Sequence, residues 1–199
     1  MLDSRPLVLM LPLLALATGC PSGSPERPGS PTTKPAYRHL AGVPEFAQVD
    51  SKLYRGAQPT REGFAQLARM GIRTIVCLRV LDTDRRKIAG MGFRYLHISF
   101  KHVHPEEEDV LEFLKTVTDP GMQPVFVHCR SAADRTGMMV AVYRIVVQGW
   151  PKPQAMAEMK QMGFHEIWEP IEDYIEDLDV EALRAKLPGA PAPGVEHVP

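Results

Sequence analysis

A cysteine and an arginine separated by five residues are the side chains in this sequence best placed to do chemistry. Cys129 directly follows an apolar run and His128, and Arg135 comes where an apolar helical pattern begins. A loop that leaves a strand and enters a helix turns successive backbone N–H groups inward, where the helix dipole also favours an anion. The sequence therefore predicts a phosphate-binding loop, made up of Arg130, Ser131, Ala132, Ala133, Asp134 and Arg135.

The two ends of this loop predict what it does with a phosphate. The guanidinium of Arg135 can fold back and bind two phosphate oxygens. The same positive field favours the thiolate form of Cys129, which is then a nucleophile. We predict phosphoryl transfer to Cys129 followed by hydrolysis, with Thr136 donating a hydrogen bond to the sulfur and His128 orienting the loop.

The elements that position this loop alternate between strands and helices. Apolar runs predict strands within residues 46–54, 72–78, 93–98 and 125–127, and helical periods predict helices over 60–70, 82–91, 106–117, 136–148, 153–162 and 170–186. Thr60 is placed to cap the first helix and Gly71 to end it. This alternation predicts an α/β fold with three layers, in which helices flank a central, largely parallel sheet of 4–5 strands.

The motif His128-Cys129-x5-Arg135-Thr136-Gly137 resembles the signature of the protein tyrosine phosphatase superfamily. The segment LYRGAQPT, which begins at Leu53, and the following GFAQLARMGIRTIVCLR are similar to the atypical dual-specificity phosphatases of the plant-and-fungal type and their bacterial relatives. The resemblance covers residues 46–149. It implies the phosphatase fold, no metal or other cofactor, and essential roles for Cys129 and Arg135.

Two departures from the family pattern bear on activity. Ala132 stands where the family usually has glycine, so a positive φ there would cost about 1 kcal/mol of strain. The loop upstream of the cysteine, residues 99–105, lacks the aspartate that usually serves as general acid. Asp134 is one candidate, because Cys-x4-Asp-Arg-Thr is similar to the myotubularin lipid phosphatases. His102 or His104, an acid within residues 106–109, and no acid at all remain alternatives.

Several nearby residues have two interpretations. Arg55 and Gln58 either fix a turn or line the pocket, and Arg130 either extends the positive field or faces solvent. The run of acids at 106–109 is typical of a helix start, where it complements the dipole. Cys77 lies inside an apolar strand and is expected to be a buried thiol, although a reversible disulfide with Cys129 is a second hypothesis.

The first twenty residues predict export. Residues 7–16 form an apolar run that is too short to span a bilayer and is typical of a signal peptide. Ala17-Thr18-Gly19-Cys20 resembles the bacterial lipobox, in which the cysteine is lipidated and becomes the mature N-terminus. We expect a signal peptide over 1–19 and a lipid anchor on Cys20, which would place the protein on the periplasmic or outer-surface side of the cell envelope. Export without lipid and a cytosolic location are alternatives.

Composition sets the remaining boundaries. Residues 20–35 are a Pro/Ser/Gly-rich tether and residues 188–199 a similar tail, both expected to be disordered. The cysteine-dependent phosphatase domain should therefore occupy residues 36–187.

A formal charge of -1 offers no basic surface for nucleic acid. The expected partners are therefore a phosphorylated protein or small molecule and, through the anchor, a membrane. The three cysteines fit neither a disulfide framework nor a zinc site.

Two other functions compete with a phosphatase acting on phosphoproteins or small polyphosphates. A rhodanese-type sulfurtransferase also uses a cysteine loop, but that family typically has a shorter spacing between cysteine and arginine. A pseudophosphatase that binds phosphorylated ligands without turnover is the stronger rival, because Ala132 and the missing loop aspartate favour it.

Overall fold

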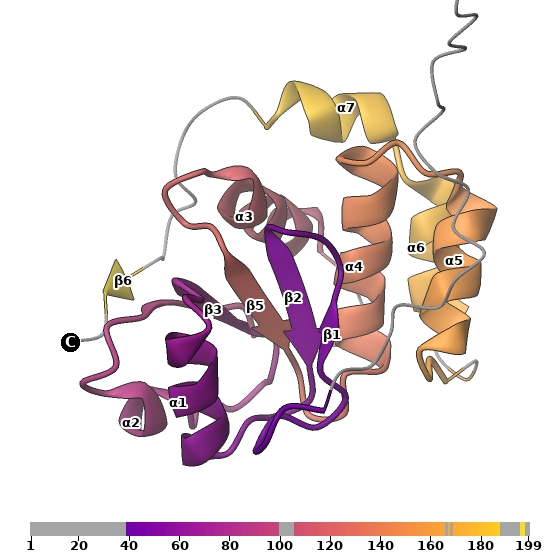
Figure 1. The fold of residues 1–199 in the computed structure, drawn as a ribbon. Coiled ribbons are helices and arrows are strands. Elements are labelled where there is room, and N and C mark those ends of the chain that lie inside the picture. The colour runs from indigo at the N-terminus through magenta and orange to yellow at the C-terminus, as the bar shows by residue number, and fades with distance from the viewer. Residues whose placement is uncertain (1–38, 100–105, 166, 168, 188–195, 198–199) are drawn as a thin grey trace, which may run out of the picture. The chain divides into compact units, whose positions relative to one another are not determined.

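Four short parallel strands form the centre of the sheet (Figure 1). The computed structural model describes residues 39–99, 106–165, 167, 169–187 and 196–197. Across the sheet the strands are β1 (Ala47–Gln48), β2 (Leu53–Gly56), β5 (Val125–His128), β3 (Thr74–Cys77), β4 (Arg94–His97) and β6 (Glu196–His197). The inner four are parallel, and the two-residue edge strands β1 and β6 are antiparallel to their neighbours. The predicted α/β class and largely parallel sheet are confirmed, and β6 is a strand that the sequence did not predict.

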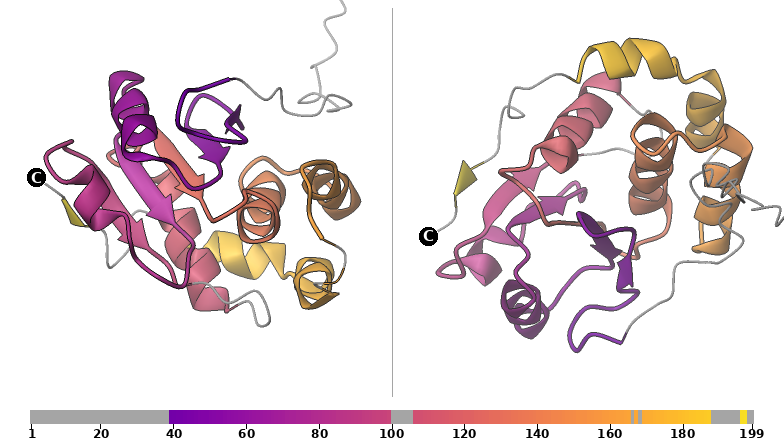
Figure 2. Two further views of the ribbon diagram at one scale, coloured as in Figure 1. Left: turned by 90° about the horizontal axis from the view of Figure 1, so that it is seen from below. Right: turned by 45° about the horizontal axis from the view of Figure 1, so that its top comes forward.

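Helices cover both faces of this sheet (Figure 2). They are α1 (Arg61–Arg69), α2 (Arg85–Ile88), α3 (Glu107–Thr118), α4 (Asp134–Val146), α5 (Lys152–Gln161), α6 (Glu169–Asp177) and α7 (Val180–Ala185). Phe64 of α1 and Ile88 of α2 pack with Phe126 in one hydrophobic core. Val76 and Val127 contribute to the second core, which contains the apolar residues of α3 and α4. Because side chains alternate along a strand, the two cores lie on opposite faces, which gives the three predicted layers.

Local signals set the ends of several helices. The Thr60 side chain accepts a hydrogen bond from the Gly63 N–H at 3.1 Å, which caps α1 as predicted. Gly71, just after this helix, has a φ of 82°, which glycine adopts at little cost. The single helix predicted over 170–186 is wrong, because Asp179 caps a new helix by accepting from the Ala182 N–H at 3.0 Å. The chain therefore forms α6 and α7 there.

The central helix α4 is buried along nearly its whole length, as its apolar sequence predicted. Arg144 is a charged residue in the buried part of this helix, and its charge is paired inside the protein. Its guanidinium binds both oxygens of Glu158 on α5, at 3.0 and 2.8 Å, and lies 4.2 Å from the centre of the Trp150 ring. Breaking a buried pair of this kind by removing one partner typically costs 3–5 kcal/mol. The pair therefore fixes α5 against the helix that begins at the phosphate-binding loop.

The described residues all belong to one unit, Thr33–Pro199. The predicted signal peptide, Cys20 and the tether lie outside them. Of the predicted tail only two residues are described, and their backbones pair with β4. Within the described part of the chain, no helix combines the length and apolar character needed to cross a membrane.

Candidate active site

Cys129 lies where β5 ends, at the carboxyl edge of the four parallel strands. Its side chain is buried, with 1% of its surface exposed. Cys129 is the first residue of the phosphate loop, which we define as residues 129–135. The buried helix α4 begins within this loop, at Asp134. Arg135, in the first turn of α4, donates a hydrogen bond from Nη1 to the Leu78 carbonyl at 3.0 Å. The structure therefore brings the predicted nucleophile and phosphate ligand to one loop, as the spacing indicated.

Three carbonyl groups of the phosphate loop are held by groups outside it. The His128 ring contacts the Cys129 oxygen through Nδ1 at 3.3 Å, and the Gln58 N–H donates to the Arg130 oxygen at 3.2 Å. Arg55 donates from Nη2 to the Ala132 oxygen. In a trans peptide the C=O and N–H point in opposite directions, so these contacts turn the N–H groups of residues 130, 131 and 133 toward the inside of the loop. Such an array of inward N–H groups is an anion-binding site.

Ala132 has the left-handed backbone conformation that the family glycine suggested. Its φ is 62°, and its side chain is buried. An L-residue in this region of φ is strained by about 1–2 kcal/mol relative to ordinary conformations. The loop therefore keeps the backbone shape of a glycine-containing phosphate loop at a cost in local strain.

Arg55 and Gln58 hold the backbone of the phosphate loop by hydrogen bonds to its carbonyl oxygens. Arg55 ends up among the largest fully buried side chains, with 1% of its surface exposed. Gln58 contacts the loop with its backbone N–H, and its side-chain Nε2 donates to Asp84 Oδ1 at 2.7 Å. Of the two interpretations given for these residues, the contacts favour a role in fixing the backbone over one in lining the pocket.

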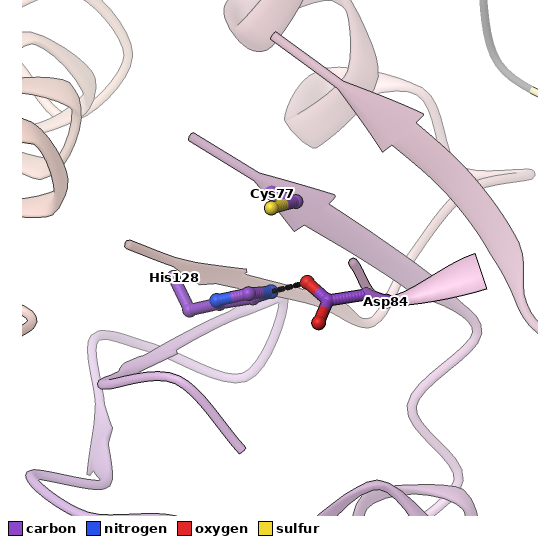
Figure 3. Close-up of side chains that lie close together, drawn as sticks. All are labelled: Cys77, Asp84 and His128. Carbon is purple, nitrogen blue, oxygen red and sulfur yellow. Dashed lines mark ion pairs between the residues drawn. The ribbon is translucent and has the colours of Figure 1, made fainter. Parts of the chain in front are cut away.

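Asp84 is a residue of this site that sequence reasoning missed. It is fully buried, and its Oδ2 lies 3.3 Å from Nε2 of His128, which is also fully buried (Figure 3). Burial by itself would raise the pKa of Asp84, but the hydrogen bond and charge of His128 outweigh it and hold that pKa well below its usual range. The only sequence signal was an acid in the polar stretch that follows β3.

Cys77 is the third buried group beside this pair, and its sulfur points toward His128 and Asp84 (Figure 3). Burial, followed by the Asp84 carboxylate, raises the pKa of the thiol to about 12. One ligand atom from each of the three side chains lies within 4.8 Å of the others. A protonated thiol is a poor metal ligand, and Lys87 Nζ lies 3.6 Å from Asp84. The chemistry of these side chains therefore does not favour a cation.

Cys77 and Cys129 are both free thiols. Cys77 pairs in register with His128 and packs in the core with Phe126, whereas Cys129 packs in the core on the other face of the sheet. A disulfide requires Cβ atoms that face each other. The hypothesis of a reversible Cys77–Cys129 disulfide is therefore not supported, and the expectation of a buried Cys77 is confirmed.

Asp134 is engaged by a residue that the sequence did not single out. Its Oδ1 accepts from the backbone N–H of His165 and contacts His165 Nδ1, both at 2.9 Å. His165 lies between α5 and α6, and 62% of its side chain is exposed. Asp134 thus ties this segment to the start of α4, and its second oxygen makes no hydrogen bond to the described residues.

The other predicted site residues divide into three groups. Arg130 and Ser131 are exposed on the loop. The hydroxyl of Thr136 is buried and has no hydrogen-bond partner among the described residues, so its bond to Cys129 stays a prediction. His102 and His104 lie outside the described residues.

The acids at 106–109 behave as a helix start. Glu107, Glu108 and Asp109 occupy the first turn of α3, as their spacing predicted. Burial, with Glu106 and Glu108 nearby, raises the pKa of Asp109. Asp109 therefore keeps its place among the alternative acids.

Comparisons with known proteins agree with this geometry. Residues 41–169 match the family model described as "DSP-PTPase phosphatase fused to NAD+ Kinase". The dual specificity protein phosphatase TpbA of Pseudomonas aeruginosa is 32% identical over 143 residues, which cover 70% of this chain and 65% of the relative's length. The inositol diphosphatase DSP5 of Arabidopsis thaliana is 27% identical over 156 residues, covering 74% of this chain and 76% of that protein.

Solved structures show the same fold. The crystal structure of P. aeruginosa TpbA has a TM-score of 0.69 and 28% identity, covering 80% of this chain and 100% of that one. A cysteine-to-serine variant of TpbA in complex with pTyr has a TM-score of 0.68 and 27% identity, covering 81% of this chain and 100% of that one.

Proposed function

Because the chain belongs to the family of dual-specificity and tyrosine phosphatase domains whose model spans residues 41–169, we propose that it is a cysteine-dependent phosphatase that hydrolyses phosphomonoesters. One observation carries the proposal. The carbonyls of Cys129, Arg130 and Ala132 all contact groups outside the phosphate loop, which leaves the N–H groups of the next residues to bind an anion in the loop that begins at Cys129.

In the first step the thiolate of Cys129 attacks the phosphorus of a bound phosphomonoester. The new S–P bond forms as the P–O bond to the leaving group breaks, and the leaving oxygen takes a proton. The inward N–H groups and Arg135 stabilise the charge on the three remaining oxygens. Arg135 reaches the phosphate by giving up or sharing its hydrogen bond to the Leu78 carbonyl.

In the second step a water molecule attacks the phosphorus of the cysteinyl phosphate. The P–O bond to water forms, the S–P bond breaks, and inorganic phosphate and the Cys129 thiolate are released. A general base that accepts the proton of the water accelerates this step, and the acid of the first step has then become the base.

Asp134 is proposed as that acid, acting through Oδ2, because Oδ1 is occupied by His165. His102, His104 and the acids at 106–109 are the alternatives. A proton donor matters most for a poor leaving group, so comparing phenyl phosphate with p-nitrophenyl phosphate in single variants identifies the acid.

A phosphorylated protein or a small polyphosphate is the proposed substrate. The relatives support both classes, since TpbA was solved with pTyr and DSP5 is called an inositol diphosphatase. Phosphotyrosine peptides are the first substrates to assay, because the TpbA variant that was solved with pTyr has 27% sequence identity to this chain and the same fold.

We also propose that the protein acts in the cell envelope, held by a lipid on Cys20. The support is the sequence alone: the short apolar run followed by Ala17-Thr18-Gly19-Cys20. Metabolic labelling with palmitate tests this proposal. Label that is lost in Cys20→Ser supports it, and an unlabelled wild type contradicts it.

The activity is tested with the chain purified in detergent, using p-nitrophenyl phosphate and a phosphotyrosine peptide under reducing conditions. Wild-type turnover that Cys129→Ser and Arg135→Ala both abolish is the expected result. Arg73→Ala, at an exposed position just before β3 and so at the opposite end of the parallel strands from Cys129, is the matched control for loss of an arginine and should remain active.

A phosphate-binding pseudophosphatase is the second candidate, favoured by the strained Ala132 with its φ of 62°. A pseudophosphatase binds a phosphopeptide but releases no phosphate from it. Tight binding without turnover, across both phosphopeptides and inositol phosphates, would replace the phosphatase proposal with this one.

A further inference from the structure

The carboxylate of Asp134 is held by one of its two oxygens. Oδ1 accepts a hydrogen bond from the backbone N–H of His165 and a second one from Nδ1 of the His165 ring, both at 2.9 Å. Oδ2 makes no hydrogen bond to the described residues, and 13% of the Asp134 side chain stays exposed. The carboxylate is therefore bound through one oxygen and open at the other.

The segment that carries these two donors is fixed beside the phosphate loop. Gly163, just after α5, has a φ of 93°, and a Cβ built on it would lie 4.0 Å from the Cβ of Ala133. The next residue, Phe164, is buried in the same core as the apolar residues of α4. The chain therefore turns at Gly163 and passes the loop at Ala133, and His165 then meets Asp134.

Helix α5, which leads into this segment, is itself packed against α4, the helix that begins with Asp134. A Cβ built on Gly137 of α4 would lie 3.0 Å from Cγ of Met159 on α5, so the two helices approach closely there. The buried ion pair of Arg144 and Glu158 joins the same two helices. Donors and acceptor therefore belong to elements that are packed together.

The two donors decide which oxygen of Asp134 can exchange a proton. A carboxylate oxygen accepts, so Nδ1 of His165 is the donor in its contact with Oδ1. An imidazole with a proton on Nδ1 donates it whether the ring is neutral or charged, so this contact does not depend on the charge of the ring. Because two N–H groups already face Oδ1, a proton on the carboxyl group belongs on Oδ2.

We propose that His165 is a positioning residue for the general acid, because it holds Oδ1 of Asp134 and leaves Oδ2 to exchange the proton. In the first step the proton passes from Oδ2 to the leaving oxygen, as the S–P bond forms and the P–O bond breaks. In the second step Oδ2 takes a proton from the attacking water. His165 acts only through Asp134, by donating hydrogen bonds. This inference rests on the proposed function, since it concerns the acid of that reaction.

Two substitutions separate the hydrogen bond from the rest of the ring. His165→Ala removes the side-chain donor, whereas His165→Asn keeps an N–H donor one bond from Cγ and has no group that titrates near pH 7. With phenyl phosphate, His165→Ala should lower kcat about tenfold at nearly unchanged KM, which is part of the effect of losing a general acid. With p-nitrophenyl phosphate the loss should be about twofold or less, because that leaving group needs little protonation. His165→Asn should restore most of the activity on phenyl phosphate.

A double-mutant cycle tests whether His165 acts through Asp134. In the Asp134→Asn background, His165→Ala should cause no further loss on phenyl phosphate, because the acid is already absent. His165→Ala should fold, since it keeps the backbone hydrogen bond and removes a ring that is 62% exposed. Ile167→Ala is the matched control, because Ile167 is 79% exposed in the same segment and its side chain donates no hydrogen bond. It should match the wild type on both substrates.

The outcomes distinguish this inference from the proposed function. Turnover by the wild type that Cys129→Ser abolishes supports the proposed function. Three results would then overturn the inference alone: equal losses of His165→Ala on both substrates, a His165→Asn variant as slow as His165→Ala, or a further loss in the Asp134→Asn background. A wild type without turnover on either substrate would overturn the proposed function and this inference together.

Discussion

The guanidinium of Arg55 donates a hydrogen bond to the backbone carbonyl of Ala132. Arg55 belongs to β2 and is fully buried, and Ala132 is the residue of the phosphate loop that has positive φ. Strained backbone persists only where its surroundings fix it. This contact therefore explains how the loop holds its shape at a position where the chain has alanine.

Replacing Arg55 tests this explanation. In Arg55→Met the Ala132 carbonyl loses its donor, which should cost about 1–3 kcal/mol of unfolding free energy, and the loop should relax toward unstrained φ values. At a temperature where the variant is fully folded, its activity on p-nitrophenyl phosphate should still be lower than that of the wild type. Arg73→Met, at an exposed position, is the control. A folded Arg55→Met variant with wild-type kcat/KM would show that the contact does not shape the loop.

Ala132→Gly should relieve the strain at φ 62°. The gain of about 1 kcal/mol is partly offset by the backbone freedom of glycine in the unfolded chain. Stability should change little, whereas phosphate affinity should rise because the loop needs less restraint to bind an anion. Inhibition by inorganic phosphate measures this affinity, and Ala133→Gly is the neighbouring control. Weaker phosphate binding in Ala132→Gly would contradict the strain argument.

The class of fold could be predicted from the sequence, as could the placement of Cys129 at the end of a strand and Arg135 at the start of a helix, because these depend on local patterns. The buried strands read as continuous apolar runs, and Thr60 and Gly71 are helix signals that depend on neighbouring residues alone. The position of the loop between Cys129 and Arg135 could be predicted in the same way, because it lies between an apolar run and a helical pattern that are adjacent in the sequence.

Contacts between distant segments could not be predicted in this way. Asp84 lies in the connection that follows β3, whereas His128 is the last residue of β5. His165 reaches Asp134 from beyond α5. Nothing in the spacing of these residues indicates that the fold brings them together. The break between α6 and α7 was a local signal that was missed, since Asp179 is an ordinary N-cap residue within an otherwise helical pattern.

Asp134→Asn separates catalysis from structure at this position. As the general acid, Asp134 should matter about 100-fold for phenyl phosphate and far less for p-nitrophenyl phosphate, whose leaving group needs little protonation. An Asn keeps an acceptor for the His165 N–H, so stability should change by about 1 kcal/mol or less. Equal losses on both substrates would contradict the acid role, and His102→Ala and His104→Ala, assayed in parallel, would then show whether either histidine serves instead.

The raised pKa of Cys77 predicts how the free energy of unfolding changes at alkaline pH. In the folded protein its pKa is raised from 9.0 to about 12, by burial and then by Asp84. Since the folded pKa is the higher one, its contribution to stability is complete below about pH 9 and is lost as the pH rises from 9 to 12. Tyr95 and Tyr143, whose pKa values burial also raises, add to the loss from about pH 10 upward.

Urea denaturation at several pH values measures this effect. The unfolding free energy of the wild type should fall from pH 9 upward, and Cys77→Ala should make the first part of that fall shallower. The comparison uses slopes, because the variant also loses packing at every pH. Identical slopes between pH 9 and 10 would mean that the buried thiol ionises as readily in the folded protein as in the unfolded chain.

The cysteinyl phosphate itself tests the central claim most directly. The chain is mixed with p-nitrophenyl phosphate, quenched in acid within the first turnovers, digested, and analysed by mass spectrometry. We predict one phosphoryl group on the peptide that contains Cys129 and none in Cys129→Ser. Turnover without that adduct, or a phosphoryl group on another residue of the loop, would contradict the proposed mechanism.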